Sequence, residues 1–472
     1  MNGSHDSSGL EPRGLGRVFW QAVAAVAAIK AVLLIVDHAP NFLMGDSAAF
    51  IGTALTKWFP TQRSWTYGFF IRWFCLSLHS LTPLLVAQSA AGFVTCVALG
   101  YCLRHYFRVS ASVAAGVMVF CAVDPLQLLY ERFVMPEAFS LAMLALVWVG
   151  CFSYCQRLRL STLLILQVLF VALISLRLQF LLPIGLVLLL LPFVGNAGRG
   201  GRAWLAKALT HLLASVVVMV VLHGAYRAAM GIKNRQPPAY SYGTNEMVLS
   251  AFAPLLRPSD STSEPLAAAV RDDAAYPLSD RSLRNNQLWN PGGLIDRLEK
   301  AGGGFYHADV SAGAIFHRMV MRDPAAVFLF GLRSYMDYWD IPAMPETLRI
   351  EGDSGPFDEA FTNLLARNFN ADVRGYPRPA LSKTLHLWLA PWLVLLLASP
   401  LLMVAMTFCA GWQKWRETSL LLMAGVIILA QYTMLSTMTV YRYLQPLTFI
   451  TLLAIGVIVQ SICRRFVSRS DR

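Results

Sequence analysis

The stretch LTPLLVAQSAAGFVTCVALGYCL, at residues 81–103, has no charged side chain and is the clearest indication of the fold. About 20 consecutive apolar residues are enough to cross the hydrocarbon core of a bilayer as a helix. Comparable apolar runs occur at residues 18–36 and 385–408. Because only helices and closed barrels satisfy their backbone groups in lipid, repeated runs of this length predict a helical protein that crosses a membrane several times.

The composition of the whole chain agrees with this prediction. Of its 472 residues, 56% are hydrophobic and 14% are charged, whereas about 25% of the residues of a soluble domain are charged. A water-soluble enzyme is therefore excluded. We expect an all-α polytopic membrane protein with about ten transmembrane helices, near residues 18–36, 81–103, 109–123, 138–155, 162–176, 178–193, 208–226, 385–408, 419–435 and 447–463.

The formal net charge of +12 raises the question of a nucleic-acid partner. The hydrophilic segment 227–384 holds 17 Lys and Arg against 18 Asp and Glu, so the basic excess belongs to the membrane part. With the N-terminus inside, that excess falls in the gaps that would face the cytoplasm, at Arg104, Arg108, Arg157, Arg159, Arg199, Arg202, Lys207, Lys414, Arg416, Arg464, Arg465, Arg469 and Arg472. The positive-inside rule thus predicts a multi-pass protein of the plasma membrane with both termini cytoplasmic, and no nucleic-acid partner is expected.

This topology divides the chain into three parts. They are an N-terminal transmembrane bundle at 1–226 with a first outer loop at 37–80, an extracytoplasmic segment of mixed structure at 227–384, and C-terminal transmembrane helices with a basic cytoplasmic tail at 385–472. Within the outer segment, the spacing of apolar residues predicts helices at 309–321 and 324–339.

Two acidic residues on the outer side are candidates for chemistry, because charged side chains in the membrane region are costly. Asp46 opens the stretch DSAAFIGTALTKW at 46–58, which predicts an interfacial helix capped by Asp46 or Ser47. There the helix dipole would keep the Asp46 carboxylate ionised and able to accept a proton, although plain capping is the commoner role. Glu137 follows Pro136 at the head of the fourth span, which suits either a site acid or an ordinary helix start.

Few basic residues are expected on the outer side, so those found there need an explanation. Arg177 and Arg442 depart from the positive-inside trend, and Arg442 lies between two tyrosines in the stretch TVYRYLQP. A guanidinium matches the geometry of a phosphate, so these arginines could hold an anion. The alternative for Arg177, and for Lys30 in the first span, is snorkelling toward the outer headgroups. No set of Cys or His residues has the spacing of a metal site.

Several short motifs follow one another in a characteristic order. They are Asp46 with an aromatic residue at Phe50, Arg63 to Tyr67 (RSWTY), Tyr130 to Glu137, Arg177, and then Arg442, Tyr443 and Pro446 before the last span. In this order of motifs the chain resembles the GT-C superfamily of integral-membrane glycosyltransferases. The resemblance covers residues 18–193 and 385–463. Within the superfamily, the chain is most similar to the bacterial branch that includes protein mannosyltransferases and aminoarabinose transferases. It departs from the family at Phe50, where Tyr is more frequent, in having a single acid in the first loop, and in the segment 227–384.

The resemblance implies a GT-C-like fold and the transfer of a sugar from a polyprenyl-phosphate-linked donor to a lipid, glycan or protein acceptor on the outer face, with inversion at the sugar carbon. It also implies that Asp46 is the general base and that Glu137 helps to orient the acceptor or the donor. The residues implied to bind the donor phosphate or to support that site are Arg442, Arg177, Arg63, Tyr443, Tyr67 and Lys30. The resemblance fixes no cofactor and leaves the use of a divalent metal open.

Two other functions stay as alternatives. A membrane transporter or lipid flippase would also be polytopic, but transporters often carry internal repeats, and the outer segment has no counterpart in the first half of the chain. A non-catalytic protein could use residues 227–384 to bind components of the cell envelope. Catalysis within this chain requires Asp46, Glu137 and Arg442 to converge at one outer site in the folded protein.

Overall fold

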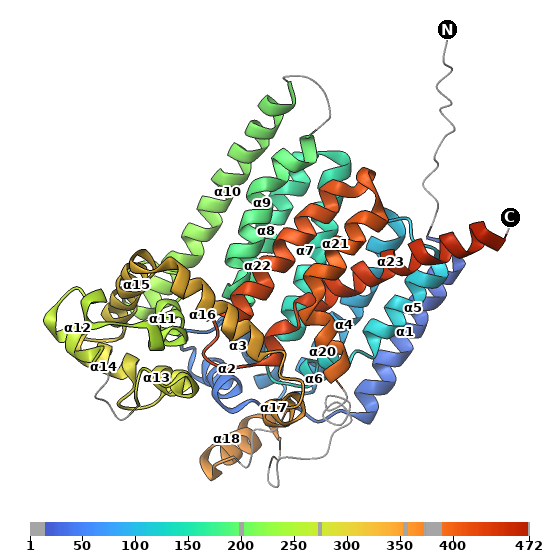
Figure 1. Ribbon diagram of the computed structural model, residues 1–472. Helices are drawn as coiled ribbons and strands as arrows, with labels where there is room; N and C mark the ends of the chain where they lie inside the picture. The colour runs from blue at the N-terminus through green and yellow to red at the C-terminus, as the bar shows by residue number, and fades with distance from the viewer. Residues whose placement is uncertain are drawn as a thin grey trace.

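The computed structural model describes residues 15–197, 203–271, 276–352, 357–371, 373 and 389–470, and the elements in these ranges are helices (Figure 1). Within this part of the chain, the only β-type pairing is an isolated bridge between Asn41 and Phe133. The expected all-α polytopic class is therefore confirmed. Arg199, Arg202, Arg472 and the expected start of the span at 385–408 lie outside the described residues.

Seven helices in the described ranges are long and apolar enough to cross a membrane. They are α1 (Gly16–Val36), α4 (Thr82–Tyr101) with its continuation η2 (Cys102–Tyr106), α7 (Glu137–Arg157), α9 (Leu181–Asn196) with η3 (Leu178–Phe180) before it, α10 (Ala203–Asn234), α22 (Trp415–Met434) with η7 (Trp412–Lys414) before it, and α23 (Leu447–Ser470). The protein is thus a multi-pass membrane protein.

Further apolar helices lie where the sequence predicts the remaining spans. A pair bent by 63° is formed by α20 (Ala390–Leu397) and α21 (Ser399–Ala410). Two shorter apolar helices are α5 (Ala111–Ala122) and α8 (Leu160–Leu176). Each expected segment therefore corresponds to an apolar helix or helix pair, while the count of about ten crossings stays a prediction.

The long helices pack side by side as a bundle with an apolar interior (Figure 1). Large side chains such as Trp148 and Phe170 are fully buried there. Small residues let helices approach closely, since a Cβ added to Gly456 would lie 2.7 Å from the side chain of Leu103. Close van der Waals packing of this kind holds helices together in lipid, where the hydrophobic effect between them is absent.

The hydrophilic segment lies at the lower end of the bundle in Figure 1, away from both chain termini. Its described residues form helices and turns: α11 (Thr244–Ala251), η4 (Ala253–Leu255), η5 (Pro258–Asp260), α12 (Glu264–Ala269), η6 (Arg281–Leu283), α13 (Arg284–Trp289), α14 (Leu294–Gly302), α15 (Phe305–Arg322), α16 (Pro324–Asp337), α17 (Met344–Gly352) and α18 (Glu359–Phe369). The expectation of mixed structure is replaced by helices here. The helices predicted at 309–321 and 324–339 are confirmed as α15 and α16, and α10 continues past residue 226 to Asn234.

The first outer loop contains α2 (Met44–Thr56), α3 (Thr66–Ile71) and η1 (Arg72–Leu76). The prediction that Asp46 or Ser47 caps α2 is wrong, because the helix begins earlier and Leu43 is at the cap position. The Ser47 hydroxyl accepts a hydrogen bond from the Leu43 N–H (2.9 Å) and donates one to the Val134 carbonyl (3.1 Å). Asn41 and Val134 also pair through their backbones (2.8 Å). These tertiary contacts set where α2 begins, and they leave the Asp46 carboxylate in the first turn available for other partners.

Candidate active site

Asp46 lies between two arginines from distant parts of the chain. Nε of Arg63 is 2.6 Å from one carboxylate oxygen of Asp46, and Nη1 of Arg442 is 2.7 Å from the other. The Asp46 side chain is 18% exposed. Burial raises the pKa of Asp46, but the charges of Arg442 and Arg63 outweigh burial and lower this pKa to about 2. In this arrangement Asp46 is ionised and is a weak proton acceptor.

Glu137 and Arg177 form a second ion pair, between the first residue of α7 and the residue that ends α8. Nη1 of Arg177 lies 3.2 Å from Oε1 of Glu137, and both side chains are buried. Within the described part of the chain, Oε2 of Glu137 and Nη1 of Arg177 make no hydrogen bond. Buried polar atoms are nearly always hydrogen-bonded in folded proteins, so this pair has capacity for a polar ligand or water.

Tyr443 connects the two ion pairs. The guanidinium of Arg442 lies 5.1 Å from the centre of its ring, and that of Arg177 lies 6.0 Å from the same centre. The ring of Tyr432 stacks on Tyr443 with 5.7 Å between centroids. Glu137 in turn interacts electrostatically with both Arg442 and Asp46. Asp46, Glu137 and Arg442 therefore converge at one site, as catalysis within this chain requires.

Glu351, from α17 of the outer segment, holds the backbone that carries Arg442. Its carboxylate accepts hydrogen bonds from the N–H groups of Tyr441 (2.5 Å) and Arg442 (3.1 Å). Burial raises the pKa of Glu351 to about 7, although these N–H groups and the charge of Arg442 act to lower it. Glu351 has no local signal in the sequence, because it is one of many acids in a hydrophilic segment.

The short 3₁₀ helix η8 (Tyr441–Leu444), which carries Arg442 and Tyr443, is also anchored by Tyr338, the residue that follows α16. The hydroxyl of Tyr338 accepts a hydrogen bond from the Val440 N–H (3.2 Å) and donates one to the Tyr432 carbonyl (3.2 Å). Tyr338 is buried. The hydrophilic segment 227–384 therefore fixes the position of Arg442, which pairs with Asp46, and of Tyr443, which contacts Arg177.

Two of the residues expected to support the site lie in a neighbouring buried cluster. Nζ of Lys30 is 2.5 Å from Oε1 of Glu131, and both side chains are buried. The hydroxyl of Tyr67 donates a hydrogen bond to Oε1 of Gln88 (2.6 Å). We therefore leave Lys30 out of the site around Arg442. Tyr67 also interacts electrostatically with Glu137 and so borders the site, whereas Arg63, Arg177 and Tyr443 belong to it.

The described residues contain no group of three or more His, Cys, Asp or Glu side chains that could hold a metal ion. At the site itself, both oxygens of Asp46 accept hydrogen bonds from arginines. A divalent cation there would meet the guanidiniums of Arg63, Arg177 and Arg442. The residues therefore do not fit a metal, and we assign no metal-dependent step.

Comparison with known proteins adds no further assignment. No protein-family model matches the chain, and no curated protein matches it in sequence. The function of the site is therefore argued from its residues and their geometry.

Proposed function

We propose that the protein is a glycosyltransferase that moves a sugar from a polyprenyl-phosphate donor to an acceptor on the outer face of the plasma membrane. The observation that supports this most is the convergence of Asp46, Glu137, Arg177 and Arg442 at one end of the bundle, although the chain separates them widely. An arginine-rich site beside apolar helices suits a ligand that combines a phosphate with an isoprenoid tail.

The arginines match the charge of such a donor. Breaking the bond between the sugar and the phosphate leaves additional negative charge on the phosphate oxygen. Arg442 and Arg177, whose guanidiniums both lie within about 6 Å of the Tyr443 ring, would stabilise that charge as it develops. Charge stabilisation in a partly buried site is stronger than in water, because the local dielectric is lower.

Asp46 serves as the general base, and binding of the donor increases the basicity of its carboxylate. While Arg442 and Arg63 hold both of its oxygens, the pKa of Asp46 stays near 2 and its basicity is low. A donor phosphate competes for Arg442. When the phosphate accepts hydrogen bonds from Arg442, Asp46 loses part of the positive charge around it, so its pKa rises and its carboxylate becomes a better proton acceptor.

The sugar is then transferred in a single displacement step. The hydroxyl or amine of the acceptor gives its proton to Asp46 while its oxygen or nitrogen forms the new bond to the sugar carbon. The bond between this carbon and the phosphate oxygen breaks, and its electron pair leaves with the lipid phosphate. Attack opposite to the leaving phosphate inverts the carbon. Glu137 would orient the reactants through Oε2, which makes no hydrogen bond within the described residues.

We also propose that the Asp46 site lies on the extracytoplasmic side of the membrane. Arg104 and Arg108 follow the end of α4 that lies away from Asp46, and Arg157 and Arg159 lie at the corresponding end of α7. The positive-inside rule therefore puts the site outside the cytoplasm. Ten crossings, with residues 1–226 and 385–472 as the membrane parts and 227–384 outside, keep both termini cytoplasmic.

The direct test compares envelope glycans and lipids by mass spectrometry in cells with and without the protein. We expect one sugar-modified lipid, glycan or protein to disappear in its absence, and we expect the purified protein to restore it from a polyprenyl-phosphate sugar. An unchanged set of envelope glycans, lipids and proteins would contradict the proposal.

One observation favours the alternative of a transporter or lipid flippase. The break of 63° between α20 and α21 resembles the interrupted helices that many transporters use to bind their substrates. Flux of a polyprenyl-phosphate lipid across proteoliposomes, without transfer of its sugar, would support this alternative instead.

A further inference from the structure

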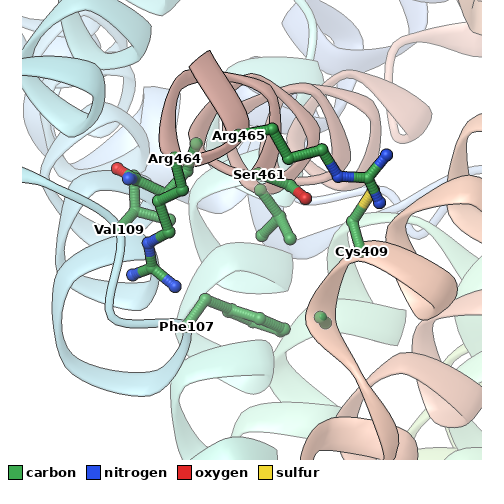
Figure 2. Close-up of a pocket in the computed structure, with 9 residues that line it drawn as sticks. Phe107, Val109, Cys409, Ser461, Arg464 and Arg465 are labelled. Carbon is green, nitrogen blue, oxygen red and sulfur yellow. The ribbon is translucent and has the colours of Figure 1, made fainter. Parts of the chain in front are cut away.

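The second half of α23 lines a cavity of about 300 Å³, at the end of the helix away from Arg442 (Figure 2). Phe107 and Val109 contribute apolar surface to it. Its polar lining comes from one helix, at Gln460, Ser461, Arg464 and Arg465. Among the described residues that line this cavity, none is acidic. The cavity therefore combines apolar surface with an excess of positive charge.

The two arginines diverge across the cavity. Figure 2 shows Arg464 extending toward Phe107 and Val109, whereas Arg465 extends toward Cys409 at the end of α21. Both arginine side chains are exposed. Their guanidiniums can thus approach an anion at the cavity from two directions, and the planar fork of each is suited to phosphate oxygens.

The wall opposite α23 is tied to it by hydrogen bonds. Nη2 of Arg464 donates to the carbonyl of Arg108 (3.0 Å), and the N–H of Ser110 donates to Oε1 of Gln460 (2.6 Å). Arg104 donates to the Val109 carbonyl (2.7 Å) and so braces the same turn. Because Oε1 of Gln460 is engaged, its amide nitrogen is the part of the side chain that can serve a ligand as a donor. These contacts keep the cavity preorganised.

The position along α23 sets the depth of the cavity relative to the membrane. Leu447 begins the helix beside the Asp46 site, and Arg464 lies about 26 Å farther along, at 1.5 Å per residue. This distance is close to the thickness of the hydrocarbon core, about 30 Å. A span of this length brings the cavity close to the headgroups of the opposite leaflet, where lipid phosphates are the abundant anions.

We propose that this cavity binds the phosphate headgroup of an anionic membrane lipid, held by Arg464 and Arg465 with Phe107 and Val109 against its glycerol end. The volume is at the lower end of the range for ligand pockets, which suits a headgroup rather than a whole lipid. The positive charge selects an anionic lipid over a zwitterionic one. This inference is independent of the sugar-transfer proposal, because it concerns the other end of α23.

The test uses the purified full-length protein in detergent, with phosphatidylglycerol or phosphatidylcholine added. We expect phosphatidylglycerol to raise the unfolding midpoint by about 3 °C more than phosphatidylcholine does. The double variant Arg464→Gln/Arg465→Gln should lose this difference. The matched double variant Arg157→Gln/Arg159→Gln removes the same charge from another loop at this end of the bundle and should keep it.

Native mass spectrometry of the unmodified protein supplies a second measurement that does not depend on any variant. Under competition, we expect phosphatidylglycerol to be retained about tenfold more than phosphatidylcholine. Equal retention of the two lipids would overturn the proposal, as would an equal loss of stabilisation in both double variants. A midpoint shift of the same size with inorganic phosphate alone would also overturn it, because the ligand would then be a soluble anion.

Discussion

Two groups of ionised side chains lie near the first outer loop, and they are built in different ways. In the first, Lys30 and Glu131 are 4% and 0% exposed and are 2.5 Å apart. In the second, Asp46 and Arg442 are 18% and 15% exposed and are 2.7 Å apart. The two pairs have the same combination of charges and nearly the same distance between them, so they differ mainly in how accessible their side chains are to a ligand.

The first group consists of Lys30, Glu131 and Arg132, and we call it the Lys30 cluster. Neighbouring residues fill the space around it. A Cβ added to Gly92 of α4 would lie 1.9 Å from Oε1 of Glu131, so this carboxylate fills the space that a side chain would take. Arg132 adds a second positive charge 3.7 Å from Glu131. Such a pair has no room for a ligand, and losing either partner would leave the other ion buried without it. The Asp46 pair can exchange one partner for a ligand, which is what a binding site requires.

The largest expected effect is on the free energy of unfolding, and it follows from a substitution in the Lys30 cluster. Glu131→Gln removes the carboxylate that is paired with buried Lys30 and Arg132, and losing one partner of a buried pair costs about 3–5 kcal/mol. We expect a loss of this size in the free energy of unfolding, measured by denaturant titration in detergent. The double variant Lys30→Met/Glu131→Gln removes the unpaired ammonium and should be more stable than the single variant. A single variant as stable as the parent would contradict the structural role of this cluster.

The next largest effect concerns the accessible pair. Asp46→Asn should reduce sugar transfer at least about 100-fold, the usual scale for a lost general base. Its unfolding free energy should fall by about 2 kcal/mol, less than in Glu131→Gln, because Arg442 and Arg63 lower the pKa of Asp46 from 3.8 to about 2 in the folded protein. Initial rates with a polyprenyl-phosphate sugar measure the first quantity. Near-normal turnover in a folded Asp46→Asn protein would remove Asp46 from the reaction.

A smaller effect of opposite sign follows from the competition for Arg442. Asp46→Asn removes the internal anion that occupies this guanidinium, so a polyprenyl phosphate without sugar should bind about tenfold more tightly than to the parent. Arg442→Gln should instead weaken this binding. Isothermal titration in detergent measures both changes. If Asp46→Asn left the affinity unchanged while the parent still bound the lipid, donor binding would not free the base, even if the sugar-transfer proposal held.

The smallest expected effect depends on pH. The pKa of Glu351 is raised from its usual 4.5 to about 7, so the folded protein holds this proton more tightly than the unfolded chain does. The stabilisation that results is complete below pH 4.5 and is lost as the pH rises through 7. Glu351→Gln cannot titrate, so the unfolding midpoint of the parent should fall by about 2–4 °C more than that of the variant across this range. Parallel curves would mean that Glu351 does not titrate there.

Several features of the site could be predicted from local sequence. Asp46, Glu137, Arg177 and Arg442 stand out because few charges occur on the side of the membrane part that the positive-inside rule predicts to be outside. Their convergence could not be derived from spacing, since Asp46 and Arg442 are 396 residues apart. Glu351 was missed for the opposite reason, because an acid in a hydrophilic segment carries no local signal.

The sequence by itself determined that this protein is an α-helical membrane protein. Hydrophobicity over about 20 consecutive residues is a local property, and it is sufficient for a segment to cross a bilayer as a helix. It also determined the distribution of positive charge among the gaps between helices. Only the tertiary structure decided that Lys30 pairs with Glu131 and that Asp46 lies between Arg63 and Arg442. Ion pairing depends on which distant segments pack together, and contacts such as that of Ser47 with Val134 set this packing.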